Sequence, residues 1–213
     1  MSINALARVV PGLLLCSFAQ VICAGATDPY GTWRISDADS AGLKRGEVVV
    51  VADVDRDRRK GGKVHAAIEI AASAEEIFLT LTDCARALKF VPHLEHCEVL
   101  ESAPDGSWQI VEHGVDQGWF APKARYVFRA EYERFRRIRF SHVSGDLREN
   151  QGTWEFLPSE DGASTMVTYN AHIVPRNYVP RWLLRSALRS DLPALLKGLR
   201  KTCESADETV HRG

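Results

Sequence analysis

The chain has 213 residues, of which 45% are hydrophobic and 26% are charged, and its 27 Lys and Arg residues nearly balance its 28 Asp and Glu residues. The formal net charge of −1 excludes a nucleic-acid binder that relies on bulk positive charge. The length and the hydrophobic content suit one domain with a substantial core.

The first 26 residues are predicted to be a secretory signal peptide. Arg8 is followed by an apolar stretch that is short for a transmembrane span, and small residues follow at Ala24-Gly25-Ala26. This pattern predicts cleavage after Ala26 and a periplasmic or secreted mature protein; the alternative is an uncleaved amphipathic anchor. No other apolar run is long enough to span a bilayer.

A hairpin and two short helices are expected next. Residues 27–46 are predicted to be a polar lead-in. The β-branched segments Glu47–Val54 and Lys63–Ile70 then predict two strands joined by a charged turn. Ser73 can cap a short helix, and a second brief helix follows before Pro92 ends it.

Six further strands are predicted after these helices, and short turns such as "PDG" and "EDG" join several of them. Consecutive strands with short connections form an antiparallel meander. The predicted strands are His96–Ala103, Ser107–Val115, Phe120–Glu133, Phe135–Gly145, Gly152–Ser159 and Ser164–Val174.

The last segment changes to a helical period, because its leucines are spaced by four, four, three and four residues along one face. Pro193 lies inside this pattern, so we expect a kink near Ser190–Pro193 or two stacked helices. Residues 206–213 are predicted to be a disordered tail. The leucines of the helical face are Leu184, Leu188, Leu192, Leu195 and Leu199.

This order of elements resembles the START-like (SRPBCC) superfamily, in particular its polyketide cyclase/dehydrase and coenzyme-Q-binding branch. The resemblance covers nearly all of the chain after the predicted signal peptide. The stretches that carry it are "VHAAIEIAASAEEIFLTLTDCARALKFVPHLEHCEVLES", "SGDLRENQGTWEF" and "YVPRWLLRSALRSDLPALLKGLRK".

The resemblance implies an α+β helix-grip fold over residues 47–205. A curved antiparallel sheet of about seven strands is expected to wrap around the long C-terminal helix. Two short helices should follow the first family strand, and Glu47–Val54 should add an extra N-terminal strand. Members of the superfamily enclose a hydrophobic cavity that binds lipids, sterols, quinones or polyketides, and some members are enzymes.

Alternation along the strands indicates which side chains point into such a cavity. One hairpin combines two glycines, a charged tip and a large aromatic residue in the segment "SHVSGDLRENQGTWEF". Gly145 and Gly152 predict a tight or bulged turn at the sheet edge. This turn would place His142 and Trp154 on the same inner wall.

The candidate ligand-binding residues share the inward parity of neighbouring strands or the leucine face of the helix. The strand Ser107–Val115 has two equally sound inner faces, one with Trp108 and Glu112 and one with Val111 and His113. His142 is either a polar anchor for a ligand or a hydrogen-bonded core histidine. The candidates are Trp108, Tyr126, Phe128, Phe140, His142, Trp154, Leu184 and Leu188.

Three of the five cysteines lie after the predicted signal peptide. Cys84 and Cys97 flank one loop and are the plausible disulfide pair; the alternative is that they and Cys203 are three buried thiols. His93, His96 and Cys97 lie in one loop, but without a second pair of ligands they do not predict a metal site. No cofactor is expected.

Two functions fit these features. The first is an exported binding protein or carrier that holds a hydrophobic small molecule or lipid in the cavity. The second is a cyclase or dehydratase that uses an acid/base pair, such as His142 and Glu112, in the same cavity. The sequence contains no Ser-His-Asp spacing, no G-x-S-x-G motif, no phosphate-binding loop and no H-E-x-x-H motif, so no residue is assigned as catalytic.

The segment Pro180–Arg189 combines Trp182 with several arginines. This composition is explained most simply by a solvated helix face; the alternative is contact with anionic lipid head groups. The expected partner is therefore a hydrophobic small molecule or lipid, with peripheral membrane contact left open. We expect a monomer that does not bind nucleic acid.

Overall fold

The computed structural model describes residues 35–55, 57, 61–116, 118, 123–177 and 179–210. The predicted signal peptide and the start of the predicted strand Phe120–Glu133 lie outside the described residues. In chain order the elements are α1 (Asp37–Lys44), β1 (Val49–Val54), β2 (Gly62–Ile70), α2 (Ala74–Thr82), α3 (Cys84–Phe90), β3 (Leu94–Ser102), β4 (Trp108–Val115), β5 (Ala124–Glu133), β6 (Arg137–Gly145), β7 (Leu147–Pro158), β8 (Thr165–Pro175) and α4 (Arg181–Val210).

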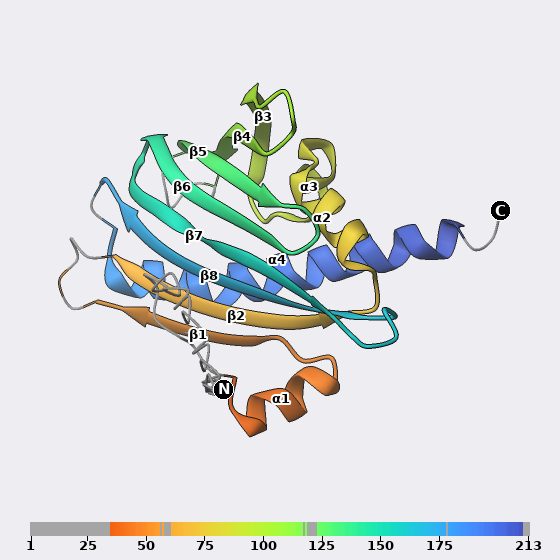
Figure 1. Ribbon diagram of the computed structural model, residues 1–213. Helices are drawn as coiled ribbons and strands as arrows, with labels where there is room; N and C mark the ends of the chain where they lie inside the picture. The colour runs from red at the N-terminus through yellow and green to blue at the C-terminus, as the bar shows by residue number, and fades with distance from the viewer. Residues whose placement is uncertain are drawn as a thin grey trace, which may run out of the picture.

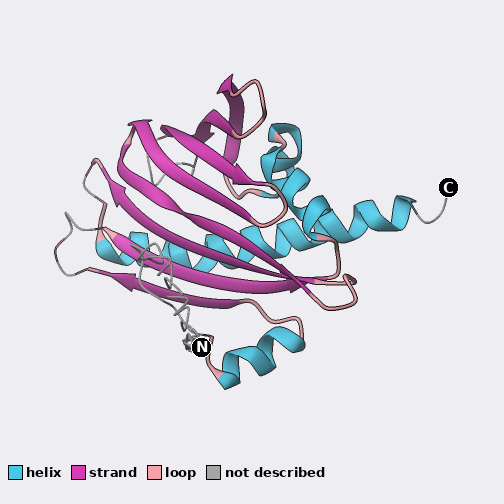
Figure 2. Cartoon of the chain, viewed as in Figure 1, coloured by secondary structure: helices cyan, strands magenta, loops and turns pink. Residues whose placement is uncertain are grey.

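The eight strands of the described residues form one antiparallel sheet in the order β1-β2-β8-β7-β6-β5-β4-β3. The N-terminal hairpin thus joins the meander through β2, which pairs with β8. The sheet curves around α4, while α2 and α3 lie near its β3–β4 end (Figure 1). Figure 2 shows the same layering of strands over the long helix. This arrangement confirms the predicted helix-grip fold, with β1 as the extra N-terminal strand.

Local capping explains where the first helices begin. Ser36 accepts a hydrogen bond from the backbone nitrogen of Asp39 at 3.1 Å, and the Asp39 carboxylate accepts one from the Ser36 backbone nitrogen. This capping box starts α1 inside the segment predicted to be a polar lead-in. Ser73 caps α2 as predicted, because its hydroxyl accepts from the Glu76 nitrogen at 3.2 Å.

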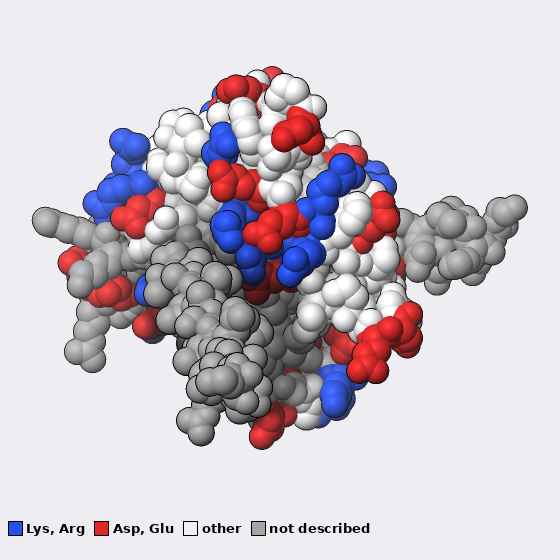
Figure 3. All heavy atoms as spheres, in the orientation of Figure 1, with Lys and Arg blue, Asp and Glu red and all other residues white. Residues whose placement is uncertain are grey.

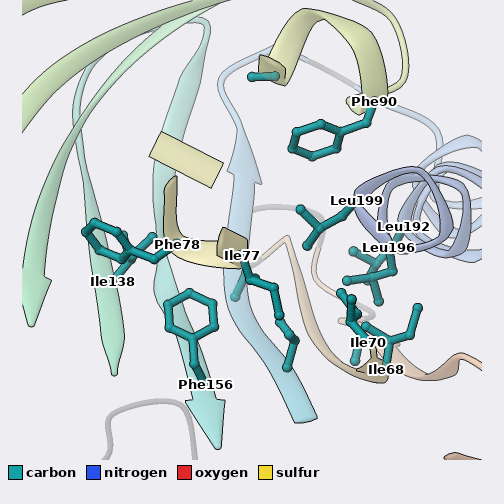
Figure 4. Packing of buried hydrophobic residues seen from close by; sticks show 14 of the residues in the cluster. Ile68, Ile70, Ile77, Phe78, Phe90, Ile138, Phe156, Leu192, Leu196 and Leu199 are labelled. Carbon is teal, nitrogen blue, oxygen red and sulfur yellow. The ribbon is translucent and has the colours of Figure 1, made fainter. Parts of the chain in front are cut away.

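Leu192 and Leu199 of the predicted leucine face of α4 pack onto the sheet, and so does Leu196, which the predicted face does not include. Figure 4 shows Leu192, Leu196 and Leu199 of α4 beside Ile68 and Ile70 of β2, and all five side chains are buried. Burying a side chain of this size contributes about 1.5–3 kcal/mol. The contact therefore supplies much of the energy that holds the helix in the curved sheet.

The helix α4 continues through Pro193 as one element, so the predicted pair of stacked helices does not occur. It also extends to Val210, into the segment predicted to be a disordered tail. Gly198 allows close packing on α3, because a Cβ atom there would lie 2.9 Å from the backbone oxygen of Phe90. Among the described helices, none contains a stretch that is both long enough and apolar enough to span a bilayer.

A disulfide links Cys84, at the start of α3, to Cys97 in β3, with their Cα atoms 5.3 Å apart. This confirms the predicted pair. Cys203 in α4 is a buried free thiol. The bond fastens the short helices to the edge of the sheet that they cover.

The hairpin between β6 and β7 turns tightly at Asp146, but its two strands pair only between Arg137–Phe140 and Gly152–Glu155. Gly145 has φ 102°, and a Cβ atom there would lie 2.3 Å from the backbone oxygen of Arg125. Only glycine therefore fits at this turn. Between the Phe140–Gly152 pair and the turn, β6 and β7 are not paired with each other.

Candidate ligand-binding cavity

A cavity of about 160 Å³ lies between the inner face of the sheet, the two short helices and α4. Among the described residues that line it there is no Asp, Glu, Lys or Arg. The lining is formed by Leu81, Thr82, Cys84, Ala87, Phe90, Val91, Cys97, Val111, His113, Tyr126, Phe128, Ala130, Tyr132, Ile138, Phe140, Asn150, Trp154, Tyr169 and Leu195.

Aromatic rings from neighbouring strands form a continuous wall of the cavity. Phe140 stacks on Tyr169 at 5.9 Å between ring centroids with an interplanar angle of 10°, and Trp154 lies 4.4 Å from Tyr169. Gly152 makes this arrangement fit, because a Cβ atom there would lie 2.5 Å from Cζ of Phe140. The absence of a side chain at Gly152 therefore leaves room for the Phe140 ring.

His113 and Tyr126 form a polar pair within this wall. Nδ1 of His113 lies 3.4 Å from the Tyr126 hydroxyl, and the His113 ring packs edge-on against Phe128. Burial, assisted by the charge of His96, lowers the pKa of His113 to about 4. Burial raises the pKa of Tyr126 to about 12. At neutral pH the pair is therefore uncharged, and it can donate and accept hydrogen bonds.

Two more polar groups face the cavity. The Asn150 side chain has no hydrogen-bond partner among the described residues, and neither has the Tyr169 hydroxyl. Burial, and then the proximity of Tyr126, raises the pKa of Tyr169. By contrast, the Tyr132 hydroxyl donates to Oε1 of Gln109 at 2.9 Å.

Four of the eight candidate residues line the cavity: Tyr126, Phe128, Phe140 and Trp154. Their inward parity follows from the strand alternation, as expected. Leu184 and Leu188 of α4 pack against the core instead, and Leu195 is the α4 residue that reaches the cavity.

Trp108 requires a correction, because it lies on the outer face of the sheet. Val111 is paired with Phe128 and His113 with Tyr126, so these β4 residues point inward. The Trp108 ring lies instead under the guanidinium group of Arg129, 4.0 Å from its centroid. Of the two alternative faces of β4, the one containing His113 is therefore the inner face.

His142 faces the same side as Phe128, with which it pairs across β5 and β6, but it does not line the cavity. Its Nδ1 atom is buried without a hydrogen-bond partner among the described residues. Glu112 lies on the opposite face, 3.1 Å from Arg125 and 3.3 Å from His96. The acid/base pair of His142 and Glu112 is therefore not assembled.

The predicted loop with His93, His96 and Cys97 is wrong, because His96 and Cys97 lie in β3. Cys97 is bonded to Cys84, while His96, Glu98 and Glu112 bring one ligand atom each within 4.8 Å of the others on the outer face. The ion pair between Arg125 and Glu112 already neutralises part of this cluster.

The candidate set lacks five lining residues with polar groups: Thr82, His113, Tyr132, Asn150 and Tyr169. The sequence allowed either face of β4 to be the inner one, so it did not decide whether His113 points into the cavity. Asn150 has the parity of Gly152 and Trp154 in β7, and this parity could have identified it. Tyr169 lies on β8, a strand that needs its register with β7 to be oriented.

Comparisons with known proteins agree with this architecture. A family model described as "Polyketide cyclase / dehydrase and lipid transport" matches residues 70–200. A comparison with curated protein sequences finds no significant match.

Solved structures with the same fold come from several bacteria. A protein of Thermus thermophilus is 25% identical over 68% of this chain and 98% of its own, with a TM-score of 0.57. A STAR-related lipid transfer protein of Xanthomonas axonopodis is 18% identical over 74% of this chain and 93% of its own, with a TM-score of 0.63. The Zhui aromatase/cyclase of a Streptomyces species is 17% identical over 74% of this chain and 94% of its own, with a TM-score of 0.56.

Proposed function

The chain belongs to the polyketide cyclase/dehydrase and lipid transport family, and on this premise we propose that it is a binding protein or carrier for an uncharged hydrophobic small molecule. The molecule is held in the cavity between the sheet, the short helices and α4. Aromatic rings supply most of the contact surface, and a few neutral polar groups orient the ligand.

The lining of the cavity is the observation that carries this proposal. Burying an unpaired charge costs several kcal/mol, and the described lining offers no charged partner. The volume of about 160 Å³ is close to the ~150 Å³ of an engineered protein cavity that binds benzene. A compound of one or two rings therefore fits this space better than a two-chain lipid.

A cyclase or dehydratase is the second candidate function. The Streptomyces aromatase/cyclase has the same fold, and His113 and Tyr126 place a ring nitrogen beside a hydroxyl in the cavity. The pKa of His113, lowered to about 4, makes its imidazole a weak general base at neutral pH. Binding without conversion is therefore preferred, and a changed mass of ligand recovered after incubation would favour the enzyme.

The proposal includes export to the periplasm or the outside of the cell. Residues 1–26 have the pattern of a signal peptide. The disulfide between Cys84 and Cys97 supports export, because disulfides persist in oxidising compartments and are rare in the cytosol.

Peripheral contact with a membrane, by a monomer, completes the proposal. Trp182 at the start of α4 is 72% exposed, and Arg185 is exposed one turn later. An exposed indole beside cations suits the interface of an anionic bilayer. Cosedimentation with vesicles that contain phosphatidylserine tests this contact, and no sedimentation at low salt would contradict it.

The central test uses Phe140→Ala and naphthalene as an apolar two-ring probe. Added naphthalene should raise the melting temperature of the wild type, with a stabilisation of RT ln(1 + [L]/Kd). Phe140→Ala should lose about 3–5 kcal/mol of stability without the probe and recover part of it with the probe, because the enlarged cavity still holds a ring.

Phe156→Ala is the matched control, since Phe156 is buried on the same face but does not line the cavity. Its naphthalene-dependent increase in melting temperature should equal that of the wild type. No increase in the wild type, together with an unrecovered loss in Phe140→Ala, would contradict the proposed function.

A further inference from the structure

Asn150 occupies an unusual position for an amide. It lies on the inner face of β7, two residues before Gly152 and four before Trp154, and only 7% of its surface is exposed. Its side chain lines the cavity among aromatic and aliphatic groups. A buried position of this kind normally belongs to an apolar residue.

The amide of Asn150 has no hydrogen-bond partner in the part of the chain that the structure describes. A side-chain amide carries two donor hydrogens and one acceptor oxygen. Leaving such a group buried and unpaired destabilises the protein, and a ligand group that pairs with it removes this cost. The backbone pairing of Asn150 with Ile173 of β8 leaves this side chain unused.

On its β6 side, Asn150 has no paired strand within the described ranges. The register of β6 with β7 ends at Phe140 and Gly152, so β6 does not pair with Asn150. The Tyr169 hydroxyl on β8 also has no partner among the described residues, and the Tyr126 hydroxyl carries the His113 contact. The described lining thus holds several uncharged donors and acceptors among apolar side chains, and the amide of Asn150 is one without a partner.

We propose that Asn150 is the specificity-determining anchor of the cavity, and that the ligand is a ring compound with an uncharged hydroxyl or carbonyl group bound to this amide. The inference rests on the proposed function and names the chemistry of its ligand. The amide hydrogens donate to the ligand oxygen, and the amide oxygen accepts from a ligand hydroxyl.

A carboxylate of the same shape is disfavoured. The Asn150 amide can donate hydrogen bonds to it, but the described lining provides no cation to balance its charge. The low pKa of His113 also keeps the imidazole neutral near pH 7. The cavity should therefore select 2-naphthol over 2-naphthoate, although both have the same two rings.

The test is equilibrium dialysis of naphthalene, 2-naphthol and 2-naphthoate against the wild type, Asn150→Leu and Gln151→Leu. Gln151 is the matched control, because neighbouring strand residues point to opposite faces and its amide lies outside the cavity lining. The wild type and Gln151→Leu should bind 2-naphthol about fivefold more tightly than naphthalene, the effect of one net hydrogen bond. Asn150→Leu should bind both with equal affinity.

The outcomes separate the two proposals. Naphthalene binding without a preference for 2-naphthol, or a preference that survives Asn150→Leu, overturns the anchor and leaves the proposed function intact. Binding of neither compound by the wild type overturns both. Retained naphthalene binding verifies that Asn150→Leu is folded; if it is lost, Asn150→Ala replaces that variant under the same criteria.

Discussion

His113 links the chemistry of the cavity to the stability of the protein. Its pKa is about 4 in the folded state, against 6.5 for an unperturbed histidine. Between these values the unfolded chain binds a proton that the folded chain does not. Stability therefore decreases as the pH is lowered from 6.5 to about 4, and His113 adds no pH dependence above that window.

His113→Gln should remove this dependence, which amounts to about 3 kcal/mol over the window. Urea unfolding at pH 7, 5.5 and 4.5 measures it as a reduced slope of the unfolding free energy against pH. Tyr126→Phe is the control, because it deletes the hydroxyl and keeps the buried imidazole, so the slope should remain. An equal slope in His113→Gln and the wild type would contradict the assignment.

At the scale of elements, α2 and α3 act as a lid on the open end of the sheet. Several of their residues line the cavity, among them Leu81, Ala87 and Phe90. Arg86 of α3 pairs with Glu76 of α2 at 2.6 Å, which joins the two helices. The disulfide in turn ties α3 to β3, so the position of the lid depends on this bond.

Removal of the disulfide by the double substitution Cys84→Ser and Cys97→Ser should cost about 3 kcal/mol of stability, the value for a closed loop of similar length. Urea unfolding with and without reductant measures the loss. Reductant should destabilise the wild type and leave the double variant unchanged. Non-reducing peptide mapping of unfolded protein should recover the Cys84–Cys97 bridge and alkylated Cys203; an alkylated Cys84 would contradict it.

At the scale of the whole molecule, the two faces of the sheet differ in kind. The outer face carries interspersed charges of both signs, which Figure 3 shows over the sheet. They include the pairs of Arg137 with Glu133 and Glu155. The inner face is mainly apolar, and the described cavity lining carries no Asp, Glu, Lys or Arg, so the charged groups of the sheet lie on the side that faces water.

The export proposal also concerns the whole molecule. Protein recovered from its native host should have an intact mass that corresponds to a chain beginning at Thr27, because cleavage is predicted after Ala26. The intact mass should also be lower by two hydrogens than that of the reduced protein, owing to the one disulfide. A chain that still begins at Met1 would be evidence against a cleaved signal peptide.

Much of the fold could be predicted because its signals are local. The spacing of the leucines oriented α4, Ser73 identified the start of α2, and alternation placed Phe128 and Phe140 on the inner face. Each of these features depends on residues within a few positions of one another, where helix and strand periods act directly.

The polar part of the candidate site depended on the tertiary structure. Both faces of β4 mix apolar and polar residues, and only the pairing of Val111 with Phe128 decides that His113 points inward and Trp108 outward. The volume of the cavity and the unpaired amide of Asn150 depend on how the inner face of the sheet, the two short helices and α4 surround one space. No local period encodes the distance between segments so far apart in the chain, because packing of the whole core sets it.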